Sequence, residues 1–169
     1  MKMTLIVIAA VVVVLVAAVV IAGLLLPRTA EASRSVLLPV PLDQAFAKVT
    51  DTAGQANWRS DIGSIDLAPD GKSWVENTRD GDRIAFRLED SVPNERYVIS
   101  YVSARGFSGV WTGRFTAEGT GTRLEVTERV TIPNPVFRVI GRLVAPPGSH
   151  TDLHLADLAK ALTPPAPAP

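Results

Sequence analysis

One glutamate lies where the sequence pattern predicts an aliphatic side chain. In the segment 122–132 the apolar face of a predicted strand runs through Leu124, Val126 and Val130, and Glu128 occupies the remaining position. A carboxylate on a buried strand face costs free energy unless it is paired or hydrated. Glu128 is therefore a candidate polar anchor, or proton donor and acceptor, in an apolar pocket. The alternative is a carboxylate near the strand end that pairs with a basic residue or contacts solvent.

A second group of reactive side chains lies near the C-terminus. His150, His154 and Asp157 follow one another at spacings that place all three on one face of a helix. Such a set resembles a metal site, but position 151 is threonine, so the H-E-x-x-H motif is absent. Isolated surface histidines near a helix start are commoner, and we expect neither a metal site nor a cofactor.

Composition excludes several kinds of chemistry. The 169 residues include 17 basic and 17 acidic side chains, so the formal net charge is +0 and gives no reason to expect nucleic-acid binding. The chain has no cysteine, which excludes a disulfide scaffold, a cysteine zinc site and a thiol nucleophile. The length suits one globular domain in addition to any membrane segment.

The N-terminal segment is long and apolar enough to cross a membrane. Leu5 to Leu26 contains no charged residue, and at ~1.5 Å per helical residue it spans the ~30 Å hydrocarbon core of a bilayer. A cleaved signal peptide is the alternative, because residues 30–32 read Ala-Glu-Ala, although the apolar run exceeds the usual length of roughly 7–15 residues. We favour a retained single-pass anchor at 1–28 and a linker at 29–33. Basic residues on both flanks leave the orientation open, and we favour a domain outside the cytoplasm.

The remaining chain alternates between helical and strand periodicity. A strand is predicted at 33–40, a short helix at 41–51, and a turn or second short helix at 52–63. Turn signals then separate six predicted strands between residues 62 and 132: they are 62–69, 72–79, 82–90, 96–104, 107–118 and 122–132. Two helical stripes follow at 136–144 and 149–162, separated by Ala-Pro-Pro-Gly, and the Pro/Ala-rich tail 163–169 is expected to be disordered.

These elements predict an α+β domain with an antiparallel sheet. Ile84, Phe86 and Leu88 share one strand face, and Trp111 and Phe115 share another. One face of the sheet must be buried, and the C-terminal helix is the available cover. A curved sheet around a single helix leaves a cavity if the inner side chains do not fill it.

This order resembles the START-like helix-grip superfamily, the SRPBCC group that includes polyketide cyclase/dehydrase-like proteins. The resemblance covers residues 32–162 and rests on "SRSVLLPVPLDQAFAKVTD" followed by Trp58, on "GVWTGRFTAEGTGTRLEVTERV", and on a last helix ending "DLHLADLAKAL". The Leu-Leu-Pro-Arg at the end of the apolar helix, shortly before Ser-Arg-Ser, also resembles membrane-anchored bacterial members. The break at 145–148 departs from the usual long helix and implies a kinked or more open cavity mouth.

The resemblance implies a START-like domain at 34–162 that binds an apolar molecule between sheet and helix. We expect a membrane-tethered, non-catalytic binding domain for a hydrophobic small molecule or lipid, with no nucleic-acid partner. A cyclase or dehydratase that uses Glu128 as general acid/base, and an interaction module with a filled cavity, remain alternatives. The expected cavity residues are Phe86, Trp111, Phe115, Leu124, Val126, Glu128, Ile140 and Leu155.

Overall fold

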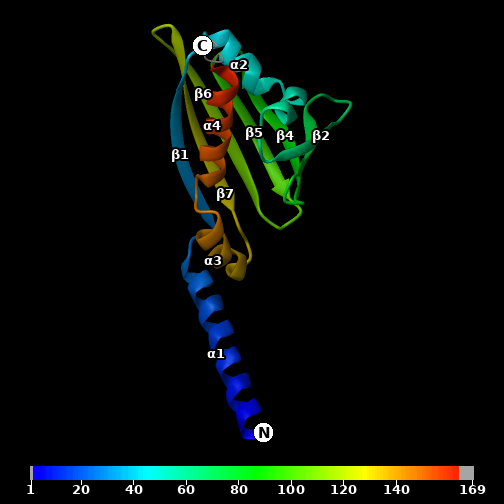
Figure 1. Ribbon diagram of the computed structural model, residues 1–169, viewed down its shortest axis with the longest axis vertical. Coiled ribbons are helices and arrows are strands. Elements are labelled where there is room, and N and C mark those ends of the chain that lie inside the picture. Colours follow the sequence, from blue (N-terminus) through cyan, green and yellow to red (C-terminus); the bar gives the residue numbers. More distant parts are fainter. Residues whose placement is uncertain (1, 164–169) are drawn as a thin grey trace, which may run out of the picture.

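The computed structural model describes residues 2–163 and consists of a long helix joined to one sheet-and-helix domain (Figure 1). Helix α1 (Lys2–Leu25) projects away from the domain, and it is long and apolar enough to cross a membrane. The Pro/Ala-rich tail was predicted to be disordered over residues 163–169, of which 164–169 lie outside the described residues.

Seven antiparallel strands form one curved sheet, as the sequence predicted. Their order is β1-β7-β6-β5-β4-β3-β2, so the first and last strands of the chain lie side by side. The strands are β1 (Thr29–Leu38), β2 (Ile62–Leu67), β3 (Ser73–Thr78), β4 (Arg83–Val92), β5 (Arg96–Ser103), β6 (Ser108–Glu118) and β7 (Gly121–Thr131).

Two short helices and two C-terminal helices complete the domain. Helix α2 (Leu42–Thr50) packs on β6 and β7, and the 3-10 helix η1 (Ala53–Asn57) adjoins β2. Helix α4 (Ser149–Leu162) lies along the concave side of the sheet, as Figure 1 shows, and buries Leu155 and Leu158. This arrangement is the START-like helix grip.

The separate helix α3 (Pro135–Val144) contacts α1 instead of covering the sheet. Ile140, which we expected to line the cavity, therefore lies on a helix that packs away from the sheet. The chain changes direction at the break 145–148. Gly148 there has a φ of 91°, a backbone conformation that favours glycine. A side chain at Gly148 would also collide with the Arg34 guanidinium, which pairs with Asp152 on α4.

The expected linker at 29–33 is also wrong, because these residues belong to β1. Ala30 pairs with Val130 and Ala32 pairs with Glu128 in the register between β1 and β7. The segment alternates between exposed and half-buried residues and contains no aliphatic side chain larger than alanine. Its strand character therefore comes from pairing with β7 and not from its own hydrophobic pattern.

Candidate ligand-binding site

The inner face of the sheet brings together most of the expected cavity residues. Trp111, Phe115, Leu124, Val126 and Leu155 are all buried in one hydrophobic cluster between sheet and helices. Phe86 lies at the edge of this face, half-buried, and stacks on Trp74 with ring centroids 5.4 Å apart. These residues form one surface, and their role in binding a ligand stays a prediction.

Ile140 does not belong to this surface. It lies on α3, which contacts α1, and 46 % of its surface is exposed. Helical periodicity placed it correctly on an apolar face but could not show which element that face meets.

Two glycines of β6 give aromatic rings room to lie flat on the inner face. A Cβ at Gly113 would collide with the ring of Trp111, and a Cβ at Gly109 would collide with the ring of Tyr101. Gly109 lies directly opposite Tyr101 in the register between β5 and β6. The absence of a side chain at Gly109 therefore lets the phenol lie across β6 towards Glu128 on β7.

Glu128 is half-buried and accepts hydrogen bonds from two hydroxyl groups. Tyr101 donates to its Oε1 at 2.7 Å, and Thr151 of α4 donates to its Oε2 at 2.6 Å. Burial raises the pKa of Tyr101, and the adjacent Glu128 carboxylate raises it further, so the phenol remains a donor. Glu128 thus connects β5, β7 and the first turn of α4.

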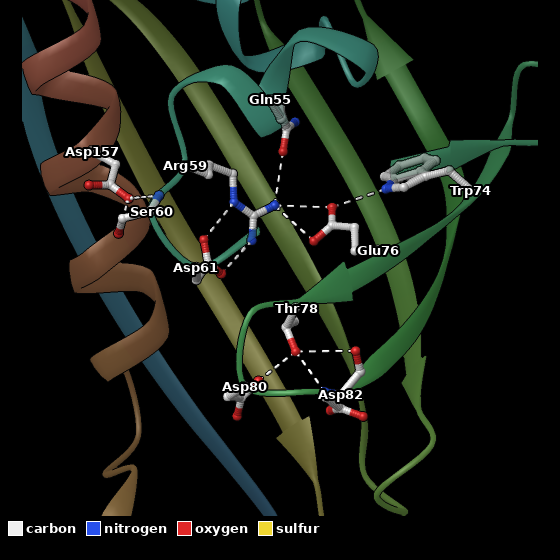
Figure 2. Close-up of polar contacts among 10 residues, drawn as sticks. All are labelled: Gln55, Arg59, Ser60, Asp61, Trp74, Glu76, Thr78, Asp80, Asp82 and Asp157. Atoms are coloured by element: carbon white, nitrogen blue, oxygen red, sulfur yellow. Dashed lines mark hydrogen bonds and ion pairs between the residues drawn. The ribbon is translucent and has the colours of Figure 1, made fainter. Parts of the chain in front are cut away.

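A buried ion pair lies between the loop before β2 and the inner face of β3 (Figure 2). Arg59 donates through Nη1 to both oxygens of Glu76, at 3.0 and 2.9 Å, and through Nη2 to Asp61 at 2.9 Å. Its Nη1 also donates to Gln55 at 2.9 Å, while Trp74 donates its indole N–H to Glu76 at 3.1 Å.

The environment raises the pKa of both partners of this pair. Burial alone would lower the pKa of Arg59, but the Glu76 and Asp61 carboxylates outweigh it and raise the pKa. Burial raises the pKa of Glu76, an effect that the Arg59 guanidinium and the Trp74 indole oppose. The hydrogen bonds satisfy both ions, as buried charges require.

The same loop is fastened to α4. Asp157 accepts hydrogen bonds from the Ser60 backbone N–H at 2.6 Å and from its hydroxyl at 2.7 Å (Figure 2). Residues 58–61, which we call the closing loop, therefore connect α4 on one side with Glu76 of β3 on the other. The loop closes the gap between the helix and the far strands of the sheet.

Three buried side-chain polar atoms have no hydrogen-bond partner among the described residues. Two of them lie at the closing loop and α4, namely Nε1 of Trp58 and Nε2 of His154, and the third is Nε of Arg138 at the start of the C-terminal helices. The His154 ring lies edge-on to two tryptophan rings, with its centroid 5.3 Å from that of Trp58 and 5.8 Å from that of Trp111. Burial lowers the pKa of His154 to about 3, and the nearby Arg59 contributes, so the imidazole is neutral at neutral pH.

The histidines therefore do not form the set that their spacing suggested. His154 faces the interior, His150 is exposed, and Asp157 binds the closing loop. Our sequence analysis did not identify Arg59 and Asp61 as partners of Glu76. The available signal was the alternation in β3, which places Glu76 on the same face as Trp74.

Side chains occupy the centre of the grip in this structure. The ring centroid of Phe46 on α2 lies 5.2 Å from that of Phe115 and 6.5 Å from that of Tyr97. The rings of Trp58 and Trp111 lie on either side of His154. Two hollows lie along α1, and one of them is lined by Leu15, Val16, Val19 and Val136.

Comparison with known proteins agrees with the helix-grip class. The sequence model of the family described as "Polyketide cyclase / dehydrase and lipid transport" matches residues 29–161, and the chain belongs to this family. A search of curated protein sequences found no match.

Solved structures share the fold. The Rhizobium loti protein Mll3558 is 26 % identical, with a TM-score of 0.65 over 79 % of this chain and 97 % of that chain. A START superfamily protein from Mycobacterium smegmatis is 15 % identical, with a TM-score of 0.61 over 78 % and 96 % of the two chains. The di-domain ARO/CYC protein StfQ of the steffimycin biosynthetic pathway is 15 % identical, with a TM-score of 0.59 over 79 % of this chain and 50 % of that chain.

Proposed function

We propose that the domain binds an apolar small molecule or lipid between its sheet and α4 and that α1 tethers it to a membrane. The observation that carries this proposal is the pair of buried, unpartnered polar atoms of Trp58 and His154 on an otherwise apolar, aromatic surface. Ligand sites usually combine apolar walls with a few polar groups that fix orientation, and buried polar groups are normally hydrogen-bonded. A polar group of the ligand would satisfy these two atoms.

Access to this site requires the interior to open. The closing loop is held by two acceptors on different elements, Asp157 on α4 and Glu76 on β3. Release of Ser60 from Asp157 would free the loop from α4 without exposing the buried ion pair. We therefore propose that the ligand displaces the Trp58 ring and that the loop re-forms over it.

The register of β1 supports retention of the anchor. The Ala-Glu-Ala sequence at 30–32 lies within a strand that pairs with β7, so cleavage there would remove the first residues of that strand. A retained α1 would be a single-pass anchor that holds the domain at the membrane, close to lipid-soluble ligands. The side of the membrane follows only from the sequence expectation of an extracytoplasmic domain.

The proposal is tested by native mass spectrometry of the full chain released from its own membrane. We expect a bound apolar molecule on the wild type and its loss from Trp58→Phe/His154→Leu, which removes both polar atoms but keeps apolar bulk. His150→Leu, on the exposed side of the same helix, is the matched control and should retain the ligand. Empty wild-type protein would count against ligand binding.

A catalytic function is a second candidate because two titratable groups converge. Glu128 and Tyr101 are in direct hydrogen-bond contact, which is the minimum that acid/base chemistry requires. Both carboxylate oxygens already accept from protein hydroxyls, however, which favours a structural and binding role. Chemical conversion of the co-purified molecule by the wild type, and not by Tyr101→Phe, would establish the enzyme instead.

A further inference from the structure

Helix α3 exposes a set of large apolar side chains next to the proposed membrane anchor. Phe137, Ile140, Leu143 and Val144 are 48 %, 46 %, 78 % and 75 % exposed, although the helix has ten residues and one buried side chain, Arg138. Soluble surfaces rarely gather so many exposed apolar groups on one short helix. The face is continuous with the exposed apolar surface of α1.

The two helices are packed tightly enough to act as one unit. A Cβ at Gly23 of α1 would collide with the backbone carbonyl of Pro135 at the start of α3. Val136 lines one hollow together with Leu15, Val16 and Val19, so the first turn of α3 lies beside the last turns of α1. Small residues at helix crossings allow such close backbone approach within membranes.

The chain itself satisfies several polar backbone groups at this junction, although Nε of the buried Arg138 has no partner among the described residues. The Arg138 guanidinium donates to the carbonyls of Gly23, Leu26 and Pro133 at 2.7–2.9 Å. The Asn134 side chain accepts from the backbone N–H groups of the first turn of α3, at 2.9 and 3.3 Å. Internal satisfaction of backbone groups is what a lipid environment demands.

The part of α1 that α3 lies beside indicates how deep α3 would lie in a bilayer that α1 spans. Val19, which lines the same hollow as Val136, precedes Leu26 by seven residues, which is about 10 Å of helix and roughly a third of a ~30 Å hydrocarbon core. A helix that contacts α1 between these two levels therefore lies within one leaflet if α1 spans the bilayer. The exposed Arg28 and Arg142 would then lie where lipid phosphates are available.

We infer that α3 inserts into the bilayer leaflet on the domain side of α1 and fixes the domain's orientation on the membrane. This inference rests on the proposed anchoring by α1. Only four residues separate α3 from α4, so the end of the grip that holds Thr151 and Glu128 lies at the bilayer surface.

Spin labels test the insertion, because the chain has no native cysteine. Three variants of the full chain each carry one spin-labelled cysteine. They are Leu143→Cys on α3, Val13→Cys in the middle of α1, and Val102→Cys on the outer face of β5. Each variant is reconstituted in phosphatidylcholine/phosphatidylglycerol vesicles, and collision rates with oxygen and with a water-soluble nickel chelate are measured. We expect the ratio of oxygen to nickel collisions to be several-fold higher at positions 13 and 143 than at 102.

Each contrary result is distinguishable. A water-exposed label at 143 together with a lipid-exposed label at 13 overturns the insertion of α3 and leaves the anchor intact. Water exposure at both positions overturns the anchor as well. Low collision rates with both reagents at 143 mean that protein, such as a second copy of the chain, covers α3, and this also overturns the inference.

Discussion

At the scale of residues, Glu128 is held by hydroxyl groups and not by a cation. The alternative in which a basic residue pairs with it is wrong, since Tyr101 and Thr151 occupy its two oxygens. Neutral donors leave the carboxylate with its negative charge inside the grip. Glu128 can therefore still serve as an acceptor for a polar ligand group that displaces one hydroxyl.

Replacing this carboxylate should affect binding more than folding. Glu128→Gln keeps the shape but removes one acceptor, so we expect a loss of about 1 kcal/mol in unfolding free energy. We expect a larger relative loss of the co-purified ligand in native mass spectra. Glu125→Gln, which is exposed on the outer face of the same strand, should change neither quantity. Heavy destabilisation by Glu128→Gln with full ligand retention would indicate a purely structural role.

The Arg59–Glu76 pair should matter far more than surface ion pairs. Arg59→Met leaves Glu76, which is 1 % exposed, without its counter-ion, and breaking a buried pair typically costs about 3–5 kcal/mol. Arg96→Met breaks the exposed pair with Asp90 and should cost about 0–1 kcal/mol. Urea unfolding of the two variants measures the contrast, and equal losses would show that the buried pair is not structurally important.

His154 should make stability depend on pH. Its folded pKa of about 3 lies below the ordinary value of 6.5, so the unfolded chain binds a proton that the folded chain does not. Stability is therefore fully present above pH 6.5 and is lost as pH falls towards 3. Between pH 7 and 5 the wild type should lose about 2 kcal/mol more than His154→Phe.

Urea unfolding at those two pH values checks this prediction. His150→Phe, at the exposed start of α4, serves as the control and should keep the wild-type pH dependence. Identical pH dependence in His154→Phe and the wild type would mean that the imidazole is hydrated in the folded protein.

At the scale of elements, the sequence was most informative where packing follows periodicity. The seven strands and the aromatic faces of β4 and β6 were predictable because alternation reports which residues share a face. Periodicity does not report what a face meets, so Ile140 was assigned to the cavity although its helix α3 packs on α1. The contact between Arg59 and Glu76 joins a loop to a strand 17 residues away, and no local pattern encodes it.

The junction of α1 and α3 should depend on the lack of a side chain at Gly23. Gly23→Leu forces the helices apart because its Cβ would meet the Pro135 backbone. We expect lower yields of oxidative cross-linking between cysteines placed at Val19 and Val136, which line one hollow. Ala22→Leu, an exposed neighbour on the same helix, is the control, and equal yields in both variants would contradict tight packing.

At the scale of the whole molecule, the chain joins an apolar helix to a helix grip whose inner surface is aromatic. The family relationship and the fold support binding of a ligand, while the filled centre of the grip requires side chains to move before one enters. Solved structures that share this fold include the di-domain ARO/CYC protein StfQ, so fold alone does not separate binding from catalysis. The account therefore depends on whether a small molecule occupies the interior.

A photoreactive residue inside the grip tests this claim most directly, because it captures a neighbour whose identity is unknown. Phe86→p-benzoylphenylalanine places the probe on the half-buried inner face of β4, and Val102→p-benzoylphenylalanine places it on the outer face of β5. The full chain is irradiated in its own membrane and its intact mass is measured. We predict a discrete small-molecule adduct at position 86 and none of the same mass at 102. Intramolecular cross-links alone at position 86, or the same adduct at both positions, would contradict an occupied interior.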